Sequence, residues 1–271
     1  MKTLRSLILL PVLLGCISAM AQTPIPPANV TNHVEYDTWK QQFVTPQDVQ
    51  PAHPVVPVTP AAADHSGTQR GGAATCDCWI TPDASYTTIN NSTQWNASGF
   101  GNGDDGSYGP INLPFSFYLY GTYWTTAYIN INGNISFGTY NGTYSSSAFP
   151  TSGPTMVAPF WADVDLRGSG VNNNKVQYKS TSTALYVNWT NVGYYSMMTD
   201  KLNSFQVIIT DGTDPVVANG ANVSFCYGDM QWTTGAASGG VNGFGGTAAT
   251  VGANKGDGTN YIQFGRFDHA G

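Results

Sequence analysis

Apolar and polar residues alternate over short runs through most of the chain after residue 78, and this period is that of strands with one buried face. In residues 111–120, every second side chain from Leu113 to Leu119 is apolar. Similar runs predict strands at residues 123–132, 135–137, 175–178, 183–190, 204–209, 223–232 and 261–264. Turn residues separate these runs, and Asn132-Gly133 is a strong signal for a type I′ hairpin. We therefore expect an all-β fold, an antiparallel β-sandwich of about ten short strands.

Residues 156–167 combine a buried run with an abrupt change to acidic residues. Alternation places Asp163 and Asp165 on one face and the intervening valine and following leucine on the other. Pro159 lacks a backbone N–H, which predicts that this strand lies at an edge, carries a bulge or is just beginning. The segment is then either a core strand whose acidic end reaches solvent or a site for a hard cation.

Residues 1–21 have the pattern of a signal peptide, with a basic start, an apolar run over residues 7–14 and small residues before a cleavage point after Ala21. This predicts a secreted, extracellular protein. An alternative is cleavage before Cys16 and lipidation of that cysteine, which would give an outer-surface lipoprotein. No segment reaches the length of a membrane span.

Residues 22–77 are rich in Pro, Ala and Gly, and we expect a disordered tether, because so little apolar surface cannot offset the entropy of ordering. An aromatic patch that includes Tyr36 and Trp39 predicts one short helix over residues 35–42. We interpret it as a transient helix in a disordered arm, with a docking element or propeptide as the alternative. The globular domain is then residues 78–271, and it could lack a C-terminal strand.

The charge argues against nucleic acid as a partner. Without the signal peptide the chain keeps eight basic residues against 16 acidic ones, a net charge of about −8, so it has no basic patch to neutralise phosphates. Charged residues make up only 10% of the chain, and Glu35 is the single glutamate. Asn, Thr, Ser, Gly and Tyr dominate instead, as is typical of strands and tight turns.

Three cysteines follow the signal peptide, namely Cys76, Cys78 and Cys226. In an oxidising compartment one pair can close, and Cys76 and Cys78 are too near each other for an ordinary bridge. We expect Cys226 to pair with Cys78 or Cys76, with free thiols as the alternative. A zinc site would need four ligands, and no histidine lies near these cysteines in the sequence.

Asp163 and Asp165 are candidate calcium ligands, because carboxylates at i and i+2 can share one hard cation with loop carbonyls. The acidic residues that could join them are Asp104, Asp105 and Asp229. Two plainer interpretations compete. The carboxylates of the Gly-rich loop over residues 100–107 could simply be solvated, and Arg167 could form a surface salt bridge of little energetic value. Apart from calcium, we expect no cofactor.

Aromatic residues are abundant, with 15 Tyr and seven Trp, and exposed rings could form a platform on which sugars stack. The candidate ligand-binding residues are Tyr118, Tyr120, Tyr123, Trp124, Tyr194 and Tyr195. Use in a protein interface and ordinary packing across the sheet are the alternatives.

Catalysis is disfavoured. A Ser-His-Asp or Cys-His arrangement needs a histidine that the core holds rigidly, but three of the four mature histidines lie in the Pro-rich arm and one near the end of the chain. A glycosidase would need two carboxylates across a cleft, whereas Asp163 and Asp165 belong to one strand.

Several blocks of sequence, in order, resemble the nidogen-like extracellular (NIDO) domain. They are DDGS at residues 104–107, LPFSF at 113–117, YININGNISF at 128–137, APFWADVD at 158–165, NSFQVI at 203–208, YGDMQWTTG at 227–235 and the Gly-rich residues 245–261. The chain is therefore identified as a member of this family, of a bacterial secreted type.

The resemblance implies a non-catalytic, secreted or cell-surface adhesion module that binds a matrix or cell-surface protein or glycan. Members of the family are matrix or surface proteins, and no catalytic residues are known for it, so none can be assigned here. A lectin-like, carbohydrate-binding domain that uses calcium is the second hypothesis. Fold analogy alone does not supply a mechanism for either function.

Overall fold

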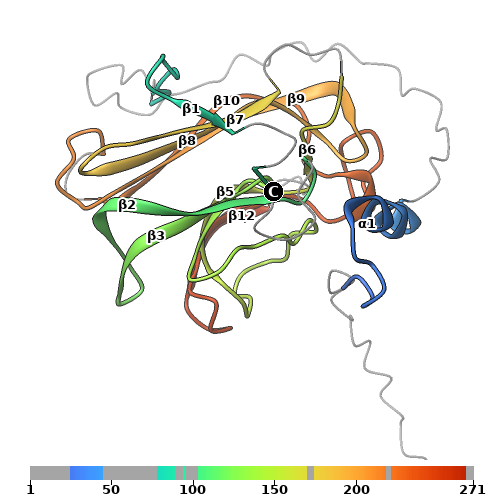
Figure 1. Cartoon of the computed structure of the whole chain (residues 1–271), viewed down its shortest axis with the longest axis horizontal. Coiled ribbons are helices and arrows are strands. Elements are labelled where there is room, and N and C mark those ends of the chain that lie inside the picture. Colours follow the sequence, from blue (N-terminus) through green and yellow to red (C-terminus); the bar gives the residue numbers. More distant parts are fainter. Residues whose placement is uncertain are drawn as a thin grey trace, which may run out of the picture.

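The computed structural model describes residues 25–44, 78–89, 94–95, 103–169, 174–217 and 221–266. Within these ranges almost all regular structure is β, in two six-stranded sheets that face each other as the layers of a sandwich (Figure 1). Every strand pair is antiparallel. The predicted all-β sandwich is confirmed. In the part of the chain described, no helix has the length and hydropathy to cross a bilayer.

The first sheet follows the order β1-β7-β8-β9-β10, and the short β6 pairs with β8 beyond the end of β7. Its strands are β1 (Thr87–Ile89), β6 (Val164–Asp165), β7 (Lys175–Ser180), β8 (Ala184–Tyr194), β9 (Met198–Thr210) and β10 (Val223–Met230).

The second sheet follows the order β12-β11-β5-β4-β3-β2. Its strands are β2 (Ser107–Leu119), β3 (Thr122–Asn130), β4 (Asn134–Phe137), β5 (Thr155–Trp161), β11 (Thr250–Asn254) and β12 (Tyr261–Arg266). The sequence predicts all of these except β11, with β5 indicated by the buried apolar run over residues 156–161 and the others by alternating runs. β11 is short, buried on both faces and part of a Gly-rich stretch. β10 and β12 are edge strands of the two sheets.

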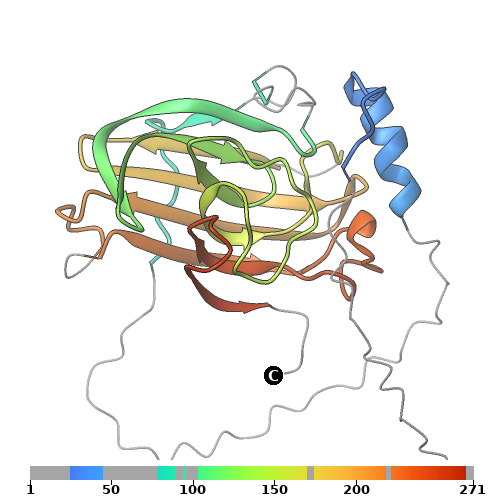
Figure 2. The ribbon, with the colours of Figure 1, turned by 90° about the horizontal axis from the view of Figure 1, so that it is seen from below.

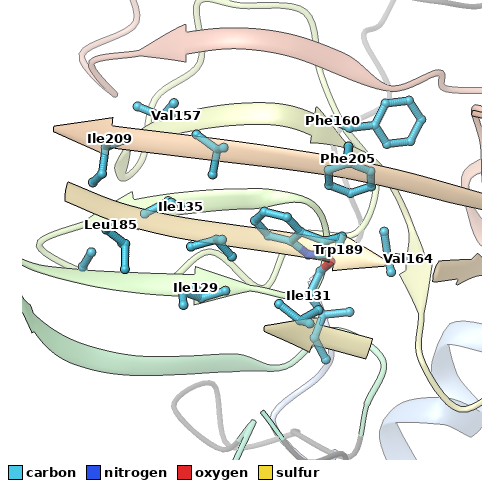
Figure 3. Close-up of a cluster of buried hydrophobic side chains, with 14 of the residues drawn as sticks. Ile129, Ile131, Ile135, Val157, Phe160, Val164, Leu185, Trp189, Phe205 and Ile209 are labelled. Carbon is cyan, nitrogen blue, oxygen red and sulfur yellow. Dashed lines mark hydrogen bonds between the residues drawn. The ribbon is translucent and has the colours of Figure 1, made fainter. Parts of the chain in front are cut away.

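Figure 3 shows the core between the sheets, where Trp189 is fully buried. Its indole donates a hydrogen bond to the carbonyl of Ile131 at 3.0 Å, and its ring stacks on Phe205 with centroids 5.0 Å apart. Around it pack aliphatic side chains from both layers, namely Ile129, Ile135, Val157, Val164, Leu185 and Ile209. Burial of each such side chain contributes about 1.5–3 kcal/mol, so this core is the main source of stability.

The hairpin predicted at Asn132-Gly133 is present, but its loop has three residues, because Asn130 pairs with Asn134. Only Gly133 has a positive φ, +70°, whereas a type I′ turn needs two such residues. A Cβ on Gly133 would lie 1.9 Å from the carbonyl oxygen of Phe160, so the turn packs directly on β5.

Pro159 lies inside the second sheet rather than at its edge, and the predicted bulge accounts for it. Along β11, Thr250 pairs with Trp161 and Gly252 with Ala158, so β5 has one extra residue at this point. The carbonyl of Pro159 accepts a hydrogen bond from the hydroxyl of Tyr227 at 2.7 Å. The bulge therefore allows proline in a central strand and turns its carbonyl toward β10.

A disulfide joins Cys78 to Cys226 on β10, which confirms one of the two predicted pairings. It fixes the start of the domain to the edge of the first sheet. Cys76, the alternative partner, lies outside the described residues, as do Cys16 and the predicted signal peptide.

The helix expected at residues 35–42 is present as α1 (His33–Lys40), followed by the 3-10 turn η1 (Gln41–Phe43). Asn32 caps it by accepting hydrogen bonds from the two backbone N–H groups at positions 34 and 35. The helix packs against one end of the sandwich (Figures 1 and 2). It is thus docked on the sandwich, so the alternative of a docking element fits the structure and the interpretation as a transient helix is wrong. For the rest of residues 22–77, the tether stays a prediction.

Candidate functional site

The ammonium group of Lys40 lies in a cage of three carboxylates at the place where α1 meets the sandwich. Its Nζ is 2.7 Å from Asp105 Oδ2, 2.7 Å from Asp163 Oδ1, and 3.0 and 3.1 Å from the two oxygens of Asp104. The side chain of Lys40 is 0% exposed, and those of the aspartates at most 2%. A buried lysine is tolerated only when it is paired in this way.

The amphipathic pattern of the helix puts Lys40 into this cage. Positions 36, 39, 40 and 43 share one face, so the lysine belongs to a stripe that also carries Tyr36, Trp39 and Phe43. The hydroxyl of Tyr36 donates to Asp105 Oδ2 at 2.8 Å. On the sandwich, the rings of Tyr144 and Tyr195 lie 4.5 and 4.1 Å from the lysine Nζ.

Arg167 adds a second cation at the edge of the cage. Its guanidinium holds both oxygens of Asp165, at 2.9 and 2.7 Å, and contacts Asp37 of α1. It also lies 3.3 Å from Asp104 Oδ2. The expected surface salt bridge is wrong in one respect, because the arginine side chain is only 12% exposed and that of Asp165 is 0% exposed. The pair is bidentate and largely buried, and through its contact with Asp37 the arginine ties the helix to β6.

The cage holds more acidic groups than basic ones. Burial raises the pKa of Asp104 well above its usual value, and Asp105 beside it adds to the shift. Burial likewise raises the pKa of Asp163 to about 7, against the opposing effect of Lys40. Burial acts to lower the pKa of Lys40, but its three carboxylate neighbours outweigh this and hold it above the ordinary value. The surplus of carboxylates favours a cation in the cage, and the raised pKa values of Asp104 and Asp163 favour their neutral, protonated forms.

The predicted cation ligands are only partly brought together. The carboxylates of Asp104, Asp105 and Asp163 converge within 4.8 Å of one another, while Asp165 turns to Arg167. Asp229 is exposed on β10. The expectation that the two loop carboxylates are solvated is wrong, since Asp104 is 1% exposed and Asp105 3%. The ammonium of Lys40 stands where the three converge, and calcium binding stays a prediction.

The six candidate aromatic residues do not form one platform. Tyr194 and Tyr195 are each 2% exposed, so their rings face protein and offer no surface to a sugar. Trp124 packs on Phe137. Tyr118 and Tyr123 are exposed, with ring centroids 5.0 Å apart at the β2–β3 hairpin.

Tyr118 and Tyr120 line an apolar groove of about 870 Å³ that opens where β10 and β12 approach each other. We call it the aromatic groove. Tyr261, Ile262 and Phe264 of β12 complete it, with 46%, 50% and 66% of their surfaces exposed. Its β12 side was not predicted, although the run over residues 261–264 supplies three apolar side chains.

The chain is similar to several animal proteins. Human alpha-tectorin is 33% identical over 186 residues, which cover 59% of this chain and 8% of that protein. Drosophila melanogaster nidogen is 27% identical over 157 residues, 48% of this chain and 11% of that protein. The Caenorhabditis elegans dendrite extension defective protein 1 is 26% identical over 172 residues, which cover 55% of this chain and 13% of that protein.

The chain thus spans between 8% and 13% of the length of these relatives. They give no support to the expectation of a bacterial type. No solved structure matches the chain significantly. The model of the family described as NIDO related matches residues 80–268, from the beginning of the sandwich to just past β12. The chain belongs to the NIDO-related family.

Proposed function

We propose that the protein is a non-catalytic, extracellular adhesion module that binds a matrix or cell-surface protein through the aromatic groove. Similarity to alpha-tectorin and nidogen supports an extracellular module. The observation that carries the proposal is the groove itself, where Phe264, Ile262 and Tyr261 expose large apolar surfaces side by side. Clustered exposed apolar residues mark interaction sites far more often than scattered ones do.

The chemistry of the groove indicates the partner. Its walls combine aliphatic side chains with tyrosine and phenylalanine rings, the residue types that protein interfaces favour, and none of the described residues that line it is charged. We therefore propose that it takes aromatic or aliphatic side chains of a partner protein. The carboxylates that acid–base catalysis would need are instead paired with Lys40 and Arg167, which favours binding over chemistry.

A binding assay on immobilised matrix proteins tests this proposal. Phe264→Ser and Tyr261→Ser should weaken binding at least tenfold, because each removes an exposed ring from the groove. Phe244→Ser is the matched control, since Phe244 is 49% exposed but lies outside the groove. Equal binding by all three variants and the native chain would exclude the groove as the adhesive surface.

A lectin is the second candidate, favoured by the exposed pair Tyr118 and Tyr123. Saturable binding on a glycan array that is lost in Tyr123→Ser and retained in Phe264→Ser would support it. Sensitivity of that binding to a chelator would assign a role to calcium.

Export is tested separately. Recovery of the chain from the medium, with an N-terminus at Gln22, is expected for a secreted protein. Recovery from membranes with lipid on Cys16 would establish the lipoprotein instead.

A further inference from the structure

Asp163 has fewer hydrogen-bond partners for its side-chain oxygens than Asp105, its neighbour in the cage around Lys40. Its Oδ1 accepts from Lys40 at 2.7 Å, while its Oδ2 is buried and has no hydrogen-bond partner. Asp105, by contrast, accepts from Tyr36, Lys40 and Asn132. A buried carboxylate normally has its lone pairs satisfied. Lys40 alone therefore stabilises a negative charge on the Asp163 side chain, which is held less well as an anion than that of Asp105.

We propose that Lys40 and Asp163 condense into an intramolecular amide that joins α1 covalently to the segment between β5 and β6. The unprotonated Nζ attacks Cγ of the protonated Asp163 carboxyl, so that a C–N bond forms. The bond from Cγ to one carboxyl oxygen then breaks, and that oxygen leaves as water. One amine proton moves to the leaving hydroxyl. No oxidant, reductant or external reactant is consumed.

The cage supplies what each step needs. Moving one proton from Lys40 to Asp163 turns a buried ion pair into a neutral amine and a neutral acid. Burial favours this exchange, whereas the neighbouring carboxylates that raise the pKa of Lys40 oppose it, so the neutral pair is the minor form from which the reaction starts. Asp105 Oδ2 lies 2.7 Å from the same Nζ, within reach to accept the amine proton and return it to the leaving oxygen. The reacting groups are held in contact by the fold, and such positioning can replace much of an entropic barrier.

Water is excluded from the site, which favours the amide over its hydrolysis. The rings of Tyr144 and Tyr195 cover the lysine Nζ. On the other side, a Cβ on Gly235 would lie 2.5 Å from Asp163 Oδ2, so the backbone covers that oxygen closely. The new bond would join residues 123 positions apart.

Cleavage between α1 and the sandwich tests the proposal on the full chain. A specific protease site is inserted between Pro60 and Ala61, and the cut protein is reduced and denatured. With the amide, the fragment that carries Lys40 stays attached to the rest of the chain. Both disulfide cysteines lie in the larger fragment, so reduction does not affect the result. Release of the small fragment from native chain overturns the proposal.

Mass spectrometry of the native chain locates the bond. The expected product is a branched peptide pair containing Lys40 and Asp163, lighter by one water than the sum of its parts. Lys40→Arg and Asp163→Ala should each release the fragment on cleavage. Water loss confined to Asp-Gly steps such as Asp105-Gly106, or a bond from Lys40 to Asp104 or Asp105, contradicts the assignment. The measurement on native chain decides the question even if a variant fails to fold.

Discussion

Replacement of Lys40 by methionine tests whether the buried ammonium holds α1 on the sandwich. Methionine keeps an unbranched chain of similar length and removes the charge. The three carboxylates around Nζ, each at most 2% exposed at the side chain, would then lose their shared cation. Arg167 contacts only Asp104 among them, so Asp105 and Asp163 would have no cation beside them.

Breaking a buried ion pair by removing one partner typically costs about 3–5 kcal/mol. The loss of unfolding free energy has an upper limit, because the helix α1 can undock and let water solvate the carboxylates, and the cost then cannot exceed that of undocking. That limit includes the burial of Tyr36 and Trp39, about 1.5–3 kcal/mol for each ring. The two limits agree, and we expect Lys40→Met to cost about 3–5 kcal/mol. For a domain of this size that lowers Tm by about 6–20 °C. An amide at Lys40 would add to the loss.

Thermal unfolding followed by circular dichroism measures the effect, and limited proteolysis around residues 41–44 reports whether the helix has left. The control is Lys255→Met, whose ammonium lies 3.3 Å from Asp257 with 42% of its side chain exposed. Exposed pairs contribute little, so the control should melt like the native chain. If Lys40→Met also melts like native chain and resists proteolysis, the cage does not depend on its lysine.

Three further substitutions probe the sandwich. Gly133→Ala should unfold the domain or cost more than about 4 kcal/mol of stability, because the added Cβ would overlap the carbonyl of Phe160. Gly121→Ala is the control, since Gly121 has open space around it and the variant bears only the strain of its positive φ. Similar melting temperatures for the two variants would refute this packing. Cys226→Ser should lower stability by about 2–4 kcal/mol and abolish the effect of reductant on Tm, and a reductant effect that persists would point to another bridge. Burial, with a neighbouring tyrosine hydroxyl, raises the pKa of Tyr178 to about 12 from 10.0, so the unfolded chain loses this proton first and stability should fall as pH rises through that interval. In Tyr178→Phe the urea-unfolding midpoint should fall less steeply with rising pH than in the native chain. An unchanged dependence on pH would exclude Tyr178 as a cause of the loss of stability.

β2 was predictable because it buries one face only. Alternation from Leu113 to Leu119 corresponds to a buried face of β2 and an exposed one. β5 is buried almost throughout and was predicted from its run of large apolar residues, whereas β11 escaped prediction because its five buried residues, TVGAN, include neither alternation nor large apolar side chains. The hairpin at Gly133 was located correctly, but its turn type was not. A type I′ turn also needs a positive φ at Asn132, and the residue type does not fix that angle.

The candidate site was only half predictable. The sequence indicates Asp163 and Asp165 as cation ligands, with Asp104 and Asp105 as possible partners, and it points to a metal ion, whereas in the structure Lys40 is the cation that Asp104, Asp105 and Asp163 share. The signal for Lys40 was present, since a lysine four residues after Tyr36 interrupts an otherwise aromatic helix stripe. A Pro-rich setting argued against a docked helix, and nothing local links position 40 to carboxylates more than 60 residues away.

Docking of α1 shortens the reach of the N-terminal arm. Val44 packs with α1 on the sandwich, and Cys78 is bonded to β10, so the length of chain between them adds nothing to the distance from Ile25 to the sandwich. An extended chain from Gln22 to Cys78 would span up to about 200 Å, whereas the residues ahead of Ile25 allow only about 10 Å from Gln22, or about 30 Å from Cys16. Were the chain lipidated at Cys16, the docked helix would keep the sandwich within about 30 Å of the membrane surface.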